Sequence, residues 1–271
     1  MRQPAVAGRF YPSGEDDLVG SIEWCFEHPL GPGLPGECTG DRRISAVMVP
    51  HAGYACSGMV AAHSYRALAE DGHPDAYVVI GPDHHGTCPG SILCSEDHLT
   101  PLGPCPVHRG ICERLSATIP DIPRAHAYEH SIEVEVPFIQ YIDPDARIVP
   151  ILMGDQSYSA AEHLAGCIRD ACRGYDVVVV ASTDMSHYVP HMDASRLDSQ
   201  VLDKVVSGDV TGMYCTIREN RVTMCGFGPT AVAMMLSEGS RKEVLRYSDS
   251  YDSLGFDPDV VVGYASAVFG R

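Results

Sequence analysis

Short apolar runs rich in β-branched residues recur along the chain, and helical patterns separate most of them. The apolar runs span 44–49, 77–80, 148–152, 177–181 and 260–267. Apolar spacing near 3.6 residues, or helix-forming composition, marks 16–27, 58–70, 160–172, 197–206 and 230–237. Continuous apolar strands alternating with helices are typical of a mostly parallel sheet covered on both faces. We therefore expect an α/β fold.

One segment, 132–138, fits two patterns. Ile132, Val134 and Val136 alternate like a strand, whereas Ser131 followed by Glu133 resembles a helix start. The proline at 137 would either kink a helix or end a strand. The pattern alone leaves helix and strand open.

The chain has 271 residues, and its only linker-like stretch is 31–40 (GPGLPGECTG). That stretch lies too close to the start to separate two domains, so we expect one domain over 1–271. The stretch also spells G-x-G-x-x-G, but no strand precedes it and it contains two prolines. We therefore predict no nucleotide cofactor.

Charge and cysteine content restrict the partners and the compartment. A formal net charge of −17 repels phosphate backbones and anionic lipids, so we expect neither nucleic acid nor membrane as a partner. Small molecules and metal cations suit such a chain better. The first residues form no apolar signal segment, and the eleven cysteines include no C-x-x-C pair. We therefore expect reduced thiols and a cytoplasmic protein.

Three apolar runs end in turns that carry histidine. His51 follows the first run, the pair His84 and His85 follows the second, and His187 follows the run at 177–181. Ligands of open α/β sheets bind beyond the carboxyl ends of the strands. A single histidine there is usually a hydrogen-bonded loop residue, but three strand ends sharing the commonest metal ligand favour a site. Adjacent side chains diverge, so we expect only one of His84 and His85 to face it.

Cys225 differs from the other cysteines because it lies in a Gly-rich turn just before a predicted helix. A helix N-terminus favours the thiolate, which can ligate a metal or act as a nucleophile. The alternative is a small buried thiol. That alternative is the expectation for five other cysteines, namely Cys25, Cys94, Cys112, Cys167 and Cys172.

Two further groups combine acids with imidazoles. Asp184 precedes His187 by three residues, and an aspartate can fix the tautomer of a nearby catalytic histidine, although Asp184 could instead cap the turn. Glu129, His130 and Glu133 form either a second wall of the pocket or a solvated helix start. We favour the pocket wall, with His130 and Glu133 as catalytic candidates.

These motifs together resemble the Memo family, known in microbes as component B of the AmmeMemoRadiSam system. The resemblance rests on PAVAGRFYP (4–12), PHAGYACSG (50–58), GPDHHG (81–86), EHSIEVEVPF (129–138), MGDQ (153–156), STDMSHY (182–188) and CGFGP (225–229). It covers nearly the whole chain in order. It implies a single α/β domain similar to class III extradiol dioxygenases, iron(II) enzymes that cleave catechol rings with a His-His-Glu triad. It also favours helix for 131–140.

Memo-type proteins are similar to those enzymes but carry cysteine at the position of the third ligand. The resemblance thus implies a metal site of His51, His84 and Cys225, with Asp184 and His187 as further pocket residues. The softness of the thiolate favours iron or copper, with zinc as an alternative. Many relatives have an aromatic residue where this chain has Cys56.

Three functions follow as hypotheses. The first is a mononuclear metal site with redox or dioxygenase-like chemistry on a small molecule. The second is an interaction module whose His-rich groove binds a peptide or a partner such as the family's radical SAM protein. The third is a metal-free hydrolase with Cys225 as nucleophile, His187 or His51 as base and Asp184 as the orienting residue. We rank them in that order, and nothing in the sequence selects a substrate.

Overall fold

A central sheet of eight strands organises the chain, as seen in a computed structural model that describes residues 1–38, 40–255 and 257–270. Its strands are β1 (Ile44–Val49), β2 (Ala76–Pro82), β3 (Ser91–Leu93), β6 (Ile148–Met153), β7 (Val177–Ser182), β8 (His187–Val189), β9 (Lys242–Asp249) and β10 (Val261–Gly270). A separate two-stranded sheet pairs β4 (His98–Thr100) with β5 (Gly103–Cys105).

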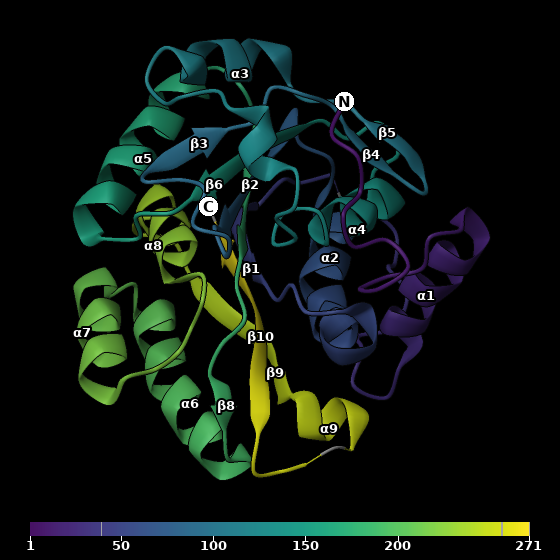
Figure 1. Cartoon of the computed structure of the whole chain (residues 1–271), viewed down its shortest axis with the longest axis vertical. Coiled ribbons are helices and arrows are strands. Elements are labelled where there is room, and N and C mark those ends of the chain that lie inside the picture. The colour runs from purple at the N-terminus through teal and green to yellow at the C-terminus, as the bar shows by residue number, and fades with distance from the viewer. Residues whose placement is uncertain (39, 256, 271) are drawn as a thin grey trace.

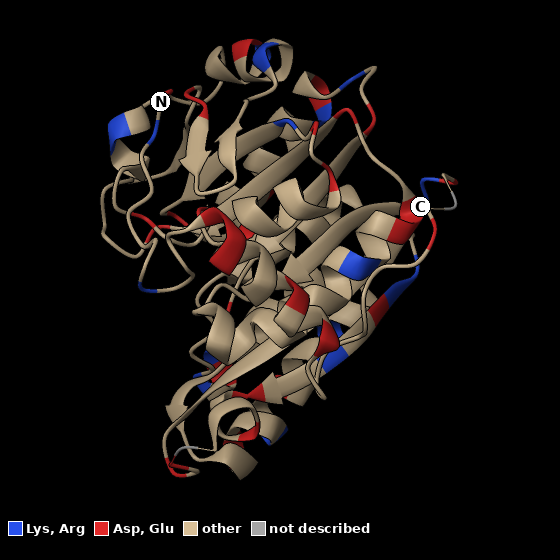
Figure 2. Cartoon of the chain, turned by 90° about the vertical axis from the view of Figure 1, so that its right-hand side faces the viewer, with Lys and Arg blue, Asp and Glu red and all other residues tan. Residues whose placement is uncertain are grey.

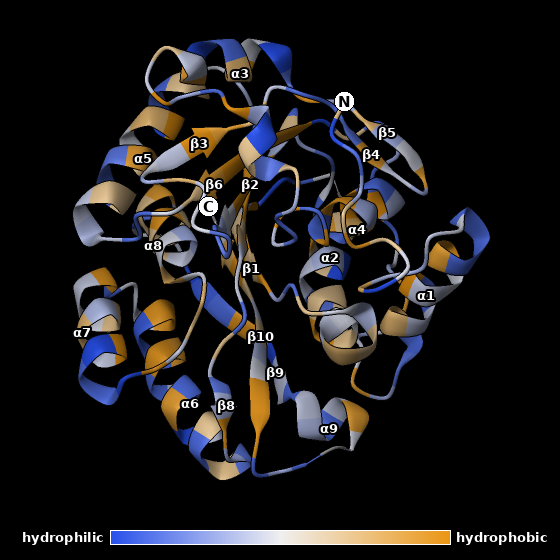
Figure 3. Ribbon diagram, viewed as in Figure 1, coloured by the Kyte–Doolittle hydropathy of each residue, from blue (hydrophilic) through white to orange (hydrophobic). Residues whose placement is uncertain are grey.

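The sheet runs in the order β3-β6-β2-β7-β1-β10-β8, and β9 also pairs with β10. The four central strands β6, β2, β7 and β1 are parallel, whereas β3, β8, β9 and β10 pair antiparallel. In Figure 3 the strands β2, β3 and β6 are drawn mainly in the hydrophobic colour, whereas the helices show both colours. Strands buried on both faces need no polar side, so their runs are continuously apolar.

Helices cover both faces of this sheet, with α1, α2 and α4 on one side and α5, α7 and α8 on the other (Figure 1). The α-helices are α1 (Glu15–Glu27), α2 (Met59–Asp71), α3 (Arg109–Ser116), α4 (Glu135–Ile142), α5 (Tyr158–Ala171), α6 (His191–Ser207), α7 (Val210–Asn220), α8 (Phe227–Leu236) and α9 (Ser250–Leu254). A π-helical turn, η1 (Tyr54–Gly58), precedes α2, and a 3-10 turn, η2 (Pro123–His126), follows α3. The prediction of a single α/β domain with a mostly parallel sheet is confirmed.

The ambiguous segment is a turn followed by a helix. Residues 131–134 form the turn and α4 begins at Glu135, so the helix that the resemblance favoured for 131–140 is present from 135 onward only. Pro137 lies in the first turn of α4, where no intrahelical partner for a backbone N–H is required, so the proline does not break the helix. The alternation does not mark one face of a strand, because the intervening Glu133 and Glu135 are buried as well as Ile132, Val134 and Val136.

Charged residues are dispersed over the fold. Figure 2 shows Lys and Arg positions scattered among Asp and Glu positions on separate elements, without a continuous basic stretch on the face in view. None of the helices in residues 1–38, 40–255 and 257–270 combines the length and the apolar character needed to cross a lipid bilayer.

Candidate metal centre

Three neighbouring strands deliver the polar residues that the sequence singled out. His51 follows the end of β1 by two residues, His84 follows β2 by two, and Asp184 follows β7 by two. Because β7 lies between β1 and β2 and all three are parallel, their carboxyl ends open at one edge of the sheet. The strand order therefore places residues from distant parts of the chain side by side.

His51, His84 and Cys225 form one cluster at this edge. One potential ligand atom from each lies within 4.8 Å of the other two. The Sγ atom of Cys225 is 3.3 Å from Nε2 of His51, and the ring centroids of His51 and His84 are 5.2 Å apart. His51 is buried, whereas 30% of the His84 side chain is exposed. The cluster is therefore reachable from solvent on the His84 side.

A serine fixes the tautomer of His51. Nδ1 of His51 lies 2.6 Å from the hydroxyl of Ser182. That hydroxyl has acceptors in the Ser131 carbonyl at 2.6 Å and the Glu135 carboxyl at 3.0 Å. Since the hydroxyl donates its single proton to one of them, it accepts the Nδ1–H of His51. Nε2 of His51 then carries the lone pair and faces Cys225.

A carboxylate fixes the tautomer of His84 in the same way. Nδ1 of His84 is 2.9 Å from one oxygen of Glu129, and the backbone N–H of His84 donates to the other oxygen at 2.7 Å. Burial opposes ionisation of His84, but the hydrogen bond and negative charge of Glu129 outweigh it and raise the pKa of the imidazole. The carboxylate accepts from Nδ1, so Nε2 of His84 is left for another partner.

The turn that carries Cys225 is held by hydrogen bonds on both sides. The backbone N–H of Asp184 donates to Sγ at 3.2 Å. The amide of Gln156 donates to the carbonyl of Cys225 at 2.8 Å and accepts from the N–H of Gly228 at 2.8 Å. Burial raises the pKa of the Cys225 thiol, so the expectation that the nearby helix start favours a free thiolate is wrong.

Asp184, His187 and His130 surround the cluster. Asp184 accepts the backbone N–H of His51 at 2.9 Å, and burial raises the pKa of its carboxyl to about 6. Nδ1 of His187 lies 2.8 Å from the carbonyl of Met185, so its proton is on Nδ1 and its lone pair on Nε2. His130 stacks on His84 with centroids 4.6 Å apart, and burial lowers its pKa to about 4.

Glu133 is engaged elsewhere. One oxygen pairs with the guanidinium of Arg2 and accepts the backbone N–H of Ala5, and the other accepts the N–H of Val6 and the hydroxyl of Tyr11. Both oxygens thus accept hydrogen bonds from the N-terminal segment. Glu133 therefore anchors that segment and has little capacity left for a catalytic role. His85 is likewise turned away, and its Nε2 lies 3.1 Å from the carbonyl of Tyr128.

Sequence reasoning missed the residues that hold the ligands. Ser182 ends an apolar strand and Gln156 follows one, and neither residue type signals a role by itself. Glu129 was singled out within the 129–133 group, but the catalytic candidates taken from that group were its neighbours. No sequence signal separates them, because the hydrogen bond between Glu129 and the backbone of His84 is visible only in three dimensions.

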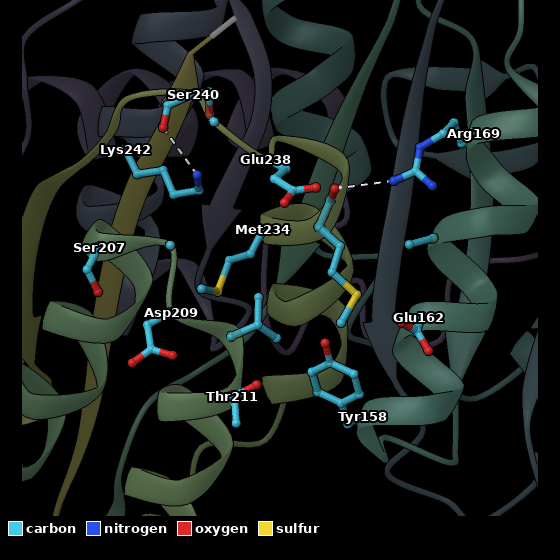
Figure 4. A pocket seen from close by; sticks show the side chains of 15 residues that line it. Tyr158, Glu162, Arg169, Ser207, Asp209, Thr211, Met234, Glu238, Ser240 and Lys242 are labelled. Carbon is cyan, nitrogen blue, oxygen red and sulfur yellow. Dashed lines mark hydrogen bonds between the residues drawn. The ribbon is translucent and has the colours of Figure 1, made fainter.

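A hollow of about 740 Å³ lies away from this cluster (Figure 4). Its wall includes Met234 and Met235 from the last turn of α8, with Lys242 at the start of β9. Cys225 precedes the first turn of the same helix. The hollow contains none of the three clustered residues.

Comparisons with known proteins agree with these features. The family model described as Memo-like protein matches residues 2–268. A MEMO1 family protein of Methanopyrus kandleri is 41% identical over 100% of this chain and 99% of its own length. One from Methanothermobacter thermautotrophicus is 43% identical over 98% of this chain and 99% of its own.

Among solved structures, an uncharacterized protein from Escherichia coli K12 has the same fold, with a TM-score of 0.58 and 17% identity. The match covers 84% of this chain and 100% of that chain. On the family model and the curated relatives together, the chain belongs to the Memo family.

Proposed function

We propose that this protein holds one iron or copper ion with His51, His84 and Cys225 and carries out redox or dioxygenase-like chemistry on a small molecule. The observation that carries the proposal is the pair of outer contacts on the two histidines. Ser182 binds Nδ1 of His51 at 2.6 Å, and Glu129 binds Nδ1 of His84 at 2.9 Å. Metal-binding histidines characteristically donate their second ring N–H to such a partner.

The donor set fits a soft or borderline ion. Two neutral imidazoles and one thiol suit iron, copper(I) or zinc better than magnesium or calcium. The backbone N–H of Asp184, 3.2 Å from Sγ of Cys225, would stabilise a thiolate ligand. A bound iron or copper ion would supply one-electron redox chemistry and Lewis acidity. Cysteine in place of the glutamate of extradiol dioxygenases changes the electronics, so we do not extend the proposal to catechol cleavage.

The surrounding residues supply the remaining tasks. The exposed side of His84 offers a path for a small substrate. His187, with its lone pair on Nε2, is proposed as the general base, and Asp184 and His130 as neighbours that hold or pass a proton. Glu133 is proposed to act only indirectly, through the N-terminal segment that it anchors.

The cytoplasmic location is part of the same proposal. All eleven cysteines are unpaired, which agrees with a reducing compartment. A thiol ligand such as Cys225 also stays available in such a compartment.

Anaerobic loading with iron(II) or copper(I), followed by metal analysis, tests the proposal. The wild type should retain one equivalent more than the Cys225→Ala and His51→Ala variants. Cys38→Ala, which removes an exposed thiol outside the cluster, is the matched control and should load like the wild type. Equal metal content in the wild type and both cluster variants would refute the proposal.

A metal-free hydrolase, ranked third from the sequence, is the other candidate that a contact favours, because Sγ of Cys225 lies 3.3 Å from Nε2 of His51. Burial, however, raises the pKa of this thiol and lowers the pKa of His51, so neither partner is readily ionised. A protonated thiol is a weak nucleophile. Alkylation of Cys225 by iodoacetamide at neutral pH should therefore be slow in the metal-free protein. Rapid alkylation that depends on His51 would favour the hydrolase.

A further inference from the structure

A second cluster of cysteine and histidine lies apart from the first and shares no residue with it. Cys94 follows β3, His98 begins β4 and His126 ends η2. Figure 1 shows β3 and β4 in its upper half. Potential ligand atoms of the three residues lie within 4.8 Å of one another. All three side chains are buried, with exposed fractions of 0%, 2% and 2%. They come from separate segments, so local sequence does not account for their meeting.

The cluster contains an unpartnered lone pair. Nδ1 of His98 lies 3.1 Å from the carbonyl of Glu96, and a carbonyl can only accept, so the proton is on Nδ1. Nε2 of His98 is then an acceptor, and this buried atom has no hydrogen-bond partner among the residues that the structure describes. Leaving a buried acceptor unpaired costs about 1–3 kcal/mol. The orphaned atom therefore indicates a missing ligand.

A backbone carbonyl also fixes the tautomer of His126. Its Nε2 lies 3.2 Å from the carbonyl of Ile92, which places the proton on Nε2 and the lone pair on Nδ1. Each imidazole thus directs one N–H at a carbonyl and keeps one lone pair, as a neutral imidazole that binds a metal does.

Burial limits the net charge that this cluster can accept. The neighbouring guanidinium of Arg2, which donates to the carbonyl of His126 at 3.1 Å, is already paired with Glu133. A zinc ion with one thiolate would leave a net charge of +1 in the buried cluster. A copper(I) ion with one thiolate leaves none. Desolvation therefore favours the monovalent ion.

We propose that Cys94, His98 and His126 form a second metal site, selective for copper(I). One thiolate and two imidazoles suit this soft ion, and within the described part of the chain the donor group has three members, one fewer than a structural zinc site uses. Bonds of about 2.0–2.3 Å, the lengths known for zinc, separate three ligand atoms by about 3.5–4 Å. Side-chain shifts of about 1 Å at most close the cluster to that size.

Binding at this site is a ligand exchange without change of oxidation state. Copper(I) forms a bond to Sγ of Cys94, the S–H bond breaks, and the proton leaves to solvent. The two imidazoles add through lone pairs they already carry. One proton is therefore released for each copper ion bound, and no oxidant or reductant is consumed.

Anaerobic titration with copper(I) against bicinchoninate tests the proposal in a Cys225→Ala background, which disables the first cluster. That variant should retain one equivalent of copper(I). Adding Cys94→Ala or His98→Asn to that variant should abolish the retention of copper(I). The asparagine side chain in His98→Asn preserves the N–H that bonds to the carbonyl of Glu96. Adding Cys25→Ala, which removes another fully buried cysteine, should leave the equivalent unchanged.

X-ray absorption of the copper-loaded Cys225→Ala protein provides a readout that needs no further variant. The expected shell contains one sulfur and two imidazole nitrogens. A shell without sulfur would overturn the proposal, as would failure of Cys225→Ala to retain copper(I). Retention of the equivalent by the Cys94→Ala and His98→Asn variants would also overturn it.

Discussion

Glu129 binds His84 twice, through Nδ1 of the imidazole at 2.9 Å and through the backbone N–H at 2.7 Å. The same carboxylate accepts the backbone N–H groups of His130 and Ser131 at 2.8 and 2.9 Å. One buried side chain thus fixes the ring, the main chain and the tautomer of a proposed metal ligand. The pKa of this carboxyl is lowered by His84 and these N–H groups despite its burial, so it remains ionised.

Replacing this carboxylate should weaken metal binding. In Glu129→Gln the amide NH2 would face a backbone N–H donor, and the imidazole would lose its anionic partner. Loss of such an outer contact typically costs 10–100-fold in metal affinity, so we expect about that decrease for iron(II). Competitive titration with a chromophoric chelator measures it.

The neighbouring histidine provides the control for this measurement. The side chain of His85 is exposed, and its Nε2 lies 3.1 Å from the carbonyl of Tyr128. His85→Gln should bind iron(II) within about twofold of the wild type. Matching affinities in Glu129→Gln and His85→Gln would show that the carboxylate does not support the ligand.

A glycine beside Cys225 sets how closely its turn approaches β7. A Cβ atom at Gly226 would lie 2.3 Å from the carbonyl oxygen of Ser182. Gly226→Ala should therefore displace the turn, reduce metal loading and cost about 1–3 kcal/mol of unfolding free energy. Gly166, in α5, has open space at that position, so Gly166→Ala should stabilise the protein by up to about 1 kcal/mol. Urea unfolding that ranks the two variants in the opposite order would contradict this close approach of the Cys225 turn to β7.

The buried pair of Arg2 and Glu133 should be important for stability. Glu133→Gln leaves the guanidinium of Arg2 buried without its counter-charge, and breaking such a pair costs about 3–5 kcal/mol. The exposed pair of Arg196 and Asp193 is the contrast, and Arg196→Gln should cost less than about 1 kcal/mol. Chemical denaturation measures both. A small effect of Glu133→Gln would show that the N-terminal segment is anchored by other contacts.

Glu135 should make stability depend on pH. Burial raises the pKa of this carboxyl from 4.5 to about 8, so the folded protein keeps the proton over a range in which the unfolded chain releases it. The stability contributed by the protonated form is complete below pH 4.5 and is lost as pH rises towards 8. The slope is at most about 1.4 kcal/mol per pH unit.

The variant Glu135→Gln cannot ionise and should lack this dependence. Its unfolding free energy relative to the wild type should improve between pH 5 and pH 8, as measured by urea denaturation at both pH values. A difference between the two proteins that stays constant with pH would argue against a protonated Glu135.

Much of the fold could be predicted from the apolar runs, because strands that are buried on both faces are apolar at nearly every position. Elements that form mainly through tertiary contacts were not predicted. The strand β3 has only three residues, and β9 carries several charged or partly exposed positions at the sheet's margin. The helix α6 begins at His191, six residues before the predicted start at 197, and four of those six residues are exposed and give no apolar helical pattern.

The sequence predicted those site residues that directly follow an apolar strand. His51 and His84 follow apolar runs directly, whereas Cys225 became a ligand candidate of equal rank only through family resemblance. Glu129 and Glu133 are four residues apart in similar surroundings, and the sequence does not distinguish them. The distinction arises from Arg2, which pairs with Glu133, and from the backbone of His84, which reaches Glu129.

Anomalous diffraction from crystals grown anaerobically with iron(II) tests the proposed centre most directly. Data collected on both sides of the iron absorption edge should give a peak bonded to Nε2 of His51, Nε2 of His84 and Sγ of Cys225 at about 2.0–2.3 Å. The peak should vanish in Cys225→Ala crystals prepared identically. Iron-loaded crystals with no peak among these three residues would contradict the account.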